Sequence, residues 1–147
     1  KAKAEATELQ LRNVEFIIQD LSDFHLNAPV EQFDFITTFD AIHDQGQPLN
    51  VLKGIRIALK PGGTYLMQDI SGTGNLEEDI DHPIGTFLYT ISCMHCMTVS
   101  LAQNGEGLGA MWGEKLTKEY LKKAGFSSVE TNKLAHDIQN NWYVVKK

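Results

Sequence analysis

The chain has 147 residues, a net charge of −6 and an isoelectric point near 5.3. This length suits a single domain with a core of its own. The acidic balance, without any run of Lys or Arg, argues against nucleic acid or an anionic membrane as partner, because such partners bind basic patches. Two cysteines, Cys93 and Cys96, are too few for a disulfide framework, so we expect a reducing, cytoplasmic setting.

The first twenty residues predict a helix followed by a strand. Residues 2–11 are rich in helix formers, but no capping residue precedes them, which indicates a piece of a longer protein. Residues 14–20, VEFIIQD, are rich in Val, Ile and Phe and predict a strand that ends at Asp20. Residues 24–32 predict a loop, since Pro29 disfavours helix at the residue before it.

The middle of the chain alternates strand and helix. Residues 33–39, FDFITTF, predict a second strand, and residues 49–59 space their leucines as a helix does. Pro61-Gly62-Gly63 stops that helix and turns the chain into a third strand at residues 64–70.

The C-terminal part predicts two more helices and two more strands. Residues 84–102 are nearly long enough to span a bilayer, but they carry several hydroxyl side chains and lack a basic flank, so we expect a buried helix. A helix from about Thr117 to Ala124 ends at Gly125. Strands at 126–134 and 141–147 are too close in sequence for a helical crossover and should pair antiparallel. The fold class is therefore α/β with a largely parallel sheet.

Four segments carry a family resemblance when they are taken together. They are VEFIIQDLSDF, FDFITTFDAIHD, ALKPGGTYLMQDI and LKKAGFSSVE. In this order and at this spacing, the chain resembles the class I S-adenosylmethionine-dependent methyltransferases over essentially its whole length. The resemblance implies one Rossmann-like methyltransferase domain over residues 1–147, mostly parallel with an antiparallel last strand and lacking its first two strands. It also implies S-adenosylmethionine as cofactor, a small molecule as methyl acceptor, and a lid insert at about 71–113.

The departure from the family pattern concerns the cofactor. The glycine-rich loop of the family's first strand and the ribose-binding acid of its second have no counterpart here. We therefore expect the chain to hold half of a cofactor site and to be inactive or crippled by itself. The strands that contain Phe16 and Phe35 would have unpaired edges, which predicts a homodimer formed through them.

The resemblance assigns cofactor contacts at the ends of two predicted strands. Asp20 and Leu21 would contact the adenine, whereas Phe39 and Asp40 would lie beside the methionine part. Ligands of open α/β sheets bind outside the carboxyl ends of the strands, which supports both assignments. The alternatives are a solvated or helix-capping Asp20 and a helix-capping Asp40.

His43 is the candidate base. It matches a family position near the methyl-transfer site, where an imidazole can take a proton from a hydroxyl, thiol or amine. A structural His43 under the lid is about as plausible. Asp40, His43 and Asp44 together are too few ligands for a metal centre, so we expect no metal.

The insert supplies two further candidates, His95 and Trp112, which would contact the substrate from the lid. Their alternatives are a buried His95 and a packed Trp112. Cys93 and Cys96 lie in the middle of an apolar helix, where packing is a better interpretation than a redox or zinc pair. The glycines at 105, 107 and 109 would let a lid move.

Two other functions stay open at this point. One is a non-catalytic binding or regulatory domain on the same scaffold. The other is a nicotinamide-dependent oxidoreductase, supported only by SGTGN at residues 71–75, a weak dinucleotide motif for which a plain loop is the better interpretation.

Overall fold

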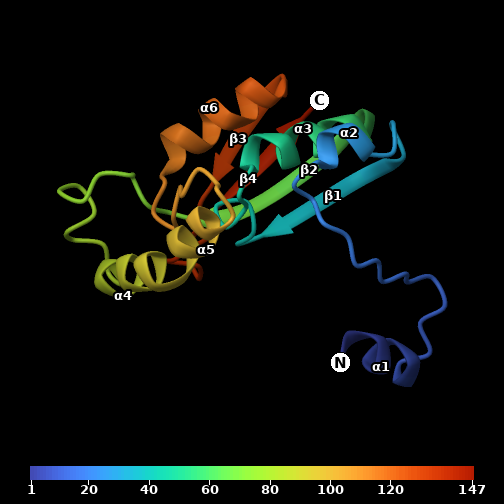
Figure 1. Ribbon diagram of the computed structural model, residues 1–147, viewed down its shortest axis with the longest axis horizontal. Coiled ribbons are helices and arrows are strands. Elements are labelled where there is room, and N and C mark those ends of the chain that lie inside the picture. Colours follow the sequence, from blue (N-terminus) through green and yellow to red (C-terminus); the bar gives the residue numbers. More distant parts are fainter.

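A computed structural model of the chain describes residues 1–147 and contains one four-stranded sheet (Figure 1). Its strands are β1 (Phe33–Phe39), β2 (Leu59–Ile70), β3 (Ser128–Asn132) and β4 (Asn140–Lys146), in the order β1-β2-β4-β3. β1 pairs parallel with β2, and β4 pairs antiparallel with both β2 and β3. Three strands thus share one direction and the last strand opposes them, which confirms the predicted mixed sheet.

Helices cover one face of this sheet. α3 (Pro48–Ala58) and α6 (Glu114–Ala124) lie along it, and the short α2 (Phe24–Asn27) packs beside α3 (Figure 1). The core fills the space between these helices and the inward-facing residues of β2 and β4. Its most deeply buried members include Leu52, Leu59, Tyr65, Met67, Leu121, Tyr143 and Val145.

The opposite face of the sheet is open within this chain. Successive residues of a strand point to opposite faces, and in β1 Ile36 packs against the core whereas the Phe35 and Phe39 side chains are more than half exposed. β1 also lies at the edge of the sheet, with β2 as its one neighbour. The expected homodimer through this edge stays a prediction.

The predicted strand at residues 14–20 is wrong for this chain. The segment pairs with no strand, and Ile17 and Ile18 are 71% and 99% exposed. A strand needs a neighbour to satisfy its backbone N–H and C=O groups, and none lies alongside. The preceding helix, α1 (Ala2–Glu8), buries no residue and lies apart from the rest of the molecule (Figure 1).

The apolar stretch at 84–102 forms a helical run that is buried along one stripe. It consists of α4 (Gly85–Ile91), a π-helical turn η1 (Ser92–Cys96) and α5 (Met97–Ala102). The stripe recurs every four residues and comprises Leu88, Ser92, Cys96 and Ser100. Its other side is open: Phe87 and Met94 are 59% and 75% exposed, so the predicted buried helix is buried along one stripe only. None of the helices has both the length and the apolar character needed to cross a membrane.

α6 ends as predicted but begins one turn earlier. Gly125 closes it in the left-handed conformation, at φ +95°. Its N-cap is Gly113, at φ +85°, where any Cβ would collide with the carbonyl of Thr73. The sequence hides this start because no side chain caps it, and glycine is there for the close approach of two backbones.

Candidate active site

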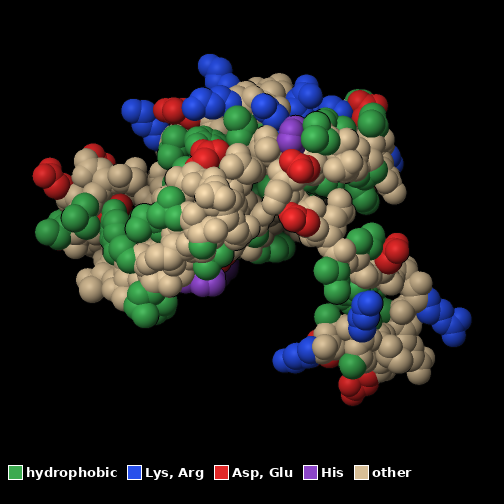
Figure 2. Space-filling model, viewed as in Figure 1, with side chains coloured by type: hydrophobic (Ala, Val, Ile, Leu, Met, Phe, Trp, Pro, Cys, Tyr) green, Lys and Arg blue, Asp and Glu red, His purple; other side chains and the backbone are tan.

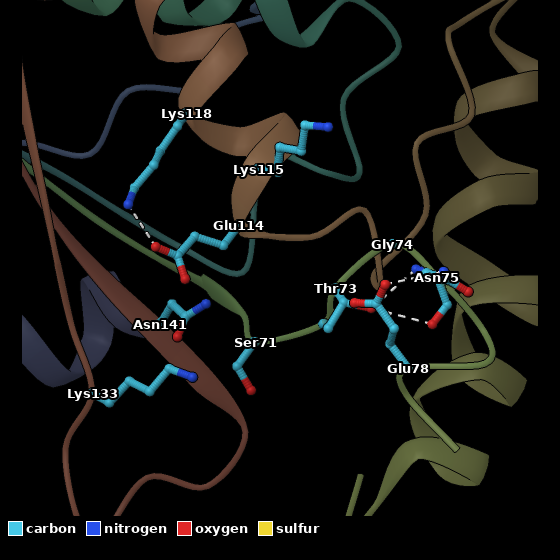
Figure 3. A pocket seen from close by; sticks show the side chains of 11 residues that line it. Ser71, Thr73, Gly74, Asn75, Glu78, Glu114, Lys115, Lys118, Lys133 and Asn141 are labelled. Atoms are coloured by element: carbon cyan, nitrogen blue, oxygen red, sulfur yellow. Dashed lines mark hydrogen bonds and ion pairs between the residues drawn. The ribbon is translucent and has the colours of Figure 1, made fainter. Parts of the chain in front are cut away.

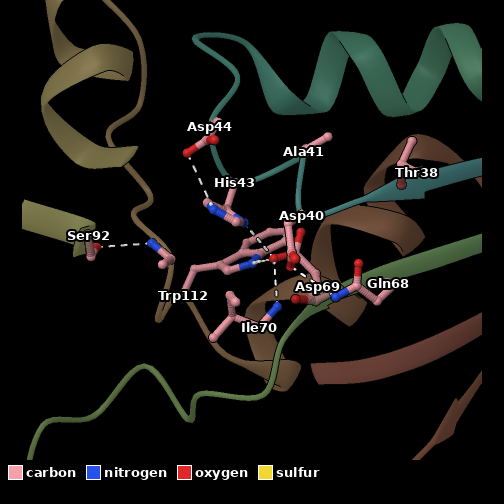
Figure 4. Close-up of polar contacts among 12 residues, drawn as sticks. Thr38, Asp40, Ala41, His43, Asp44, Gln68, Asp69, Ile70, Ser92 and Trp112 are labelled. Carbon is pink, nitrogen blue, oxygen red and sulfur yellow. Dashed lines mark hydrogen bonds and ion pairs between the residues drawn. The ribbon is translucent and has the colours of Figure 1, made fainter. Parts of the chain in front are cut away.

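A buried histidine–carboxylate pair lies at the carboxyl edge of the sheet (Figure 4). His43 follows β1 and Asp69 belongs to the end of β2, and parallel strands bring their carboxyl ends to the same edge. His43 Nδ1 lies 2.6 Å from Asp69 Oδ1, and the two residues are 3% and 0% exposed. The sequence identified His43 as the candidate base but did not identify Asp69 as its partner.

Asp69 is held by two other donors. Its Oδ1 accepts the backbone N–H of Ile70 at 2.9 Å and the indole N–H of Trp112 at 3.4 Å, while Oδ2 has no partner. Trp112 is 4% exposed and packs edge-to-face against Tyr120. The candidate lid residue therefore reaches the active site through Asp69, from within the core.

Two opposing effects set the pKa of His43. Burial disfavours the charged imidazole and lowers the pKa, but the hydrogen bond to Asp69 and the charges of Asp69, Asp44 and Asp40 outweigh it, so the pKa is raised. The second ring nitrogen, Nε2, faces Asp44 at 3.3 Å. Each nitrogen of His43 thus meets a carboxylate.

Cys96 completes a cluster with His43 and Asp44 in which the potential metal-ligand atoms lie within 4.8 Å of one another. Asp40, expected beside this pair, is not part of it. Burial, and then the Asp44 carboxylate, raise the pKa of Cys96 to about 12, so the thiol stays protonated at neutral pH. Structural zinc sites use four ligands, one more than this cluster offers. Cys93 is exposed and both cysteines are free.

Asp40 lies at the open side of the same edge, in the left-handed conformation at φ +43°. Its backbone N–H bonds the carbonyl of Gln68 at 3.1 Å, and its carboxylate accepts the Gln68 amide at 3.1 Å. Desolvation raises the pKa of Asp40 although the Gln68 hydrogen bond opposes it. The alternative role as a helix N-cap is wrong, because Gln47 occupies that position before α3. Phe39 packs edge-to-face with Trp142 and stays 55% exposed.

Three predicted site residues lie elsewhere. Asp20 is exposed, and its carboxylate accepts the Ser22 backbone N–H at 2.9 Å and hydroxyl at 2.7 Å, which lower its pKa. Leu21 is half-buried against the core, and His95 is exposed on η1. The structure therefore joins His43 and Trp112 through Asp69 and places Asp40 at the same edge of the sheet, bonded to Gln68. Asp20, Leu21 and His95 lie outside this network.

The glycines of the predicted lid hinge are tightly packed. Gly105 donates to the carbonyl of Ser100 at 2.9 Å, and a Cβ on Gly105 would collide with Gly46. Gly107 donates to the Ser100 hydroxyl at 3.0 Å. These glycines let the segment approach the active-site loop closely, a role that their spacing in sequence does not reveal.

Comparison with known proteins identifies the class. Residues 1–137 match the model of a family described as "Methyltransferase domain", and the chain belongs to that family. Its fold is the Rossmann-like fold of class I S-adenosylmethionine-dependent methyltransferases, which confirms the resemblance in the sequence. No curated protein sequence matches the chain.

Solved structures share this fold at low sequence identity. An O-methyltransferase family protein from Burkholderia thailandensis superposes over 99% of the chain with a TM-score of 0.72 and 16% identity. Human N-acetylserotonin methyltransferase, in complex with SAM, superposes over 93% of the chain with a TM-score of 0.61 and 22% identity. A SAM-dependent methyltransferase from Aquifex aeolicus superposes over 98% of the chain with a TM-score of 0.62 and 17% identity. The chain spans 40%, 36% and 60% of their respective lengths.

Proposed function

We propose that the protein containing this domain transfers a methyl group from S-adenosylmethionine to a small-molecule acceptor, with His43 as the base that removes the acceptor's proton. The observation that carries the proposal is the 2.6 Å contact between His43 and the buried Asp69, beside Asp40 at the carboxyl edge of the sheet. Family membership and neighbours named as O-methyltransferases support it.

Phe39 and Asp40 are the residues of this chain that fit one wall of the cofactor site. When bound, S-adenosylmethionine supplies an activated methyl carbon. An exposed aromatic ring and a carboxylate suit its sulfonium end, because a negative charge near the cation is favourable. Asp20 and Leu21 remain proposed adenine contacts: the Asp20 carboxylate is turned to Ser22, and the segment before it lies outside the sheet.

Asp69 gives His43 the orientation a base requires. If His43 donates Nδ1–H to Asp69, Nε2 carries the lone pair that accepts a proton. Nε2 now faces Asp44, so the acceptor's hydroxyl, thiol or amine has to take the place of that carboxylate. Trp112 donates to the same Asp69 oxygen and acts as a positioning residue.

A second candidate is a binding or regulatory domain without catalysis. The observation in its favour is the enclosure of His43, which is 3% exposed and has a carboxylate at each ring nitrogen. The nicotinamide alternative has less support: residues 71–75 form a loop, and the next helix, α4, begins ten residues after it.

The test uses the intact protein. Calorimetry with S-adenosylmethionine should give binding, and radiolabelled methyl transfer should identify an acceptor among hydroxyl, thiol and amine compounds. With that acceptor, His43→Gln should lower kcat about 100-fold or more, the range for loss of a general base. In the wild type kcat should rise with pH through the raised pKa of His43, and Asp69→Asn should move that rise to lower pH. Absence of cofactor binding, or an unchanged pH profile in His43→Gln, would contradict the proposal.

A further inference from the structure

A polar pocket of about 660 Å³ lies at the carboxyl ends of β2 and β3, beside the start of α6 (Figure 3). We name it the lysine pocket. None of its eleven lining residues is hydrophobic. They are Ser71, Gly72, Thr73, Gly74, Asn75, Glu78, Glu114, Lys115, Lys118, Lys133 and Asn141. His43 and Asp40 are not among them, so the pocket is distinct from the active site.

The charges of the pocket oppose those of the chain. Three lysines and two glutamates give its lining a net charge of +1, in a chain whose net charge is −6. Lys118 is paired with Glu114 at 2.6 Å, whereas Lys115 and Lys133 form no ion pair. Lys and Arg side chains also gather along the outer side of α6 (Figure 2). Two free ammonium groups therefore remain for a ligand.

The backbone around the lysine pocket is fixed. The buried Asp79 accepts the Thr73 N–H at 3.0 Å and the Tyr89 hydroxyl at 2.8 Å, which anchors the loop after β2. Gly113 brings the start of α6 against the same loop, and the Glu114 N–H bonds the Gly72 carbonyl at 3.3 Å. The first turn of a helix has N–H groups without helical partners and attracts anions.

Asn141 gives the lysine pocket a buried polar wall. It is 1% exposed, its amide N–H bonds the Tyr143 hydroxyl at 3.3 Å, and its amide oxygen has no partner. A buried polar atom without a partner carries a free-energy penalty, and native proteins retain few of them. This oxygen is an acceptor, so a hydroxyl group of a ligand, and not its oxyanion, would satisfy it. In the sheet Asn141 is the register partner of Asp69, so the pocket adjoins the active-site network.

We propose that the lysine pocket is a second binding site, which takes a small molecule bearing a phosphate or carboxylate group. Lys115 and Lys133 lie on opposite sides of the start of α6 (Figure 3), and a charge-assisted hydrogen bond from either one, together with the start of α6, matches such an oxyanion. The polar lining suits a hydroxylated body and offers no surface to an aromatic one. The proposal does not depend on the methyl-transfer reaction.

An NMR titration of the isotopically labelled intact protein tests both affinity and location. The probes are glycerol 3-phosphate, malate and uncharged glycerol, so that a phosphate ligand and a carboxylate ligand are distinguished. We expect one of the two anions, and not glycerol, to shift the backbone amide signals of residues 71–75 and 114–118. Failure of both anions to bind, or shifts confined to other regions, would overturn the proposal.

Matched variants separate the lysine pocket from general charge effects. Lys115→Gln with Lys133→Gln should weaken anion binding about tenfold, as expected for losing the charge-assisted contact in a solvated site. Lys122→Gln removes a charge from the exposed side of α6 and should change affinity less than about twofold, because distant surface charges are screened. Equally weakened anion binding in the double variant and in Lys122→Gln, or unchanged binding in the double variant, would refute a specific site in the lysine pocket.

Discussion

The active site and the lysine pocket lie at the same edge of one sheet, but they place their charges in opposite ways. In the first, Asp69 and His43 are buried and bonded to each other. In the second, Lys115 and Lys133 are exposed and have no ionic partner. Burial and pairing thus separate charges that support the fold from charges that are available to a ligand, even where the register partners Asp69 and Asn141 adjoin.

The largest expected effect on stability comes from the buried charges of the active site. Asp69→Ala should lower the free energy of unfolding by about 3–5 kcal/mol, because it leaves His43 and the donors of Ile70 and Trp112 without an acceptor. Denaturant unfolding measures this. Asp34→Ala is the matched control: its side chain is 83% exposed and paired with Lys60, and its loss should cost less than about 1 kcal/mol. A similar loss of unfolding free energy in Asp69→Ala and Asp34→Ala would contradict the distinction between buried and exposed charges.

Close packing of the 103–113 segment against the active-site loop gives the next effect. Gly105→Ala should destabilise the protein by about 1–3 kcal/mol, the usual cost of overpacking, because the new methyl group would meet Gly46 and lie 2.6 Å from the Ser100 hydroxyl. Gly46→Ala is the control on the other side of the contact. Its Cβ would meet Gln103 at 3.5 Å, an ordinary contact, and the melting temperature should change little. A tolerated Gly105→Ala would favour the mobile lid expected from the glycine spacing.

These sites also mark what the sequence could predict. Residues 14–20 and 33–39 have the same strand-like composition, yet only the second has a neighbour, β2, to pair with. Local pattern gives the tendency to form a strand, whereas pairing depends on other parts of the chain. The helices at α3 and α6 were predictable because their apolar spacing is a local signal, and Gly125 ends α6 as expected. The predicted stop of the first of them at Pro61-Gly62-Gly63 is wrong, because α3 ends at Ala58 and these three residues belong to β2.

Prediction of the active site was limited in the same way, because local signals do not reveal contacts between distant parts of the chain. Asp40 and His43 follow a strand, so the general rule for α/β sheets identifies them. Asp69 lies 26 residues from His43 and Trp112 lies 43 residues from Asp69, and their meeting depends on sheet register and on the path of the insert. Neither follows from the spacing of residues along the chain.

The pH dependence of the free energy of unfolding tests the buried side of the comparison at a single residue, His43. The folded pKa of His43 is raised above its ordinary value of 6.5, so the folded state holds the proton more tightly than the unfolded state. This contribution is fully present below the unfolded pKa and is lost as pH rises through the folded pKa. The free energy of unfolding should therefore fall with pH above about 6.5, the ordinary histidine value.

His43→Gln supplies the reference for this measurement. The carboxylates of Asp40, Asp44 and Asp69 surround position 43 in both proteins, so the difference between the two unfolding curves isolates the imidazole. A wild-type curve that runs parallel to that of the variant would contradict a charge held between these carboxylates. Cys96 should not contribute near neutral pH, since its pKa is raised to about 12.

The smallest effect is expected on the stability of the lysine-pocket variant. Lys115→Gln with Lys133→Gln should change the free energy of unfolding by less than about 0.5 kcal/mol, because neither ammonium group has a partner to lose. The pH dependence due to His43 should also persist in this variant, measured in the same denaturant series. A substantial loss of stability would mean that these lysines support the fold as Asp69 does. Unchanged stability together with weakened anion binding would instead assign them to a ligand, which is the distinction that burial and pairing draw between the two sites.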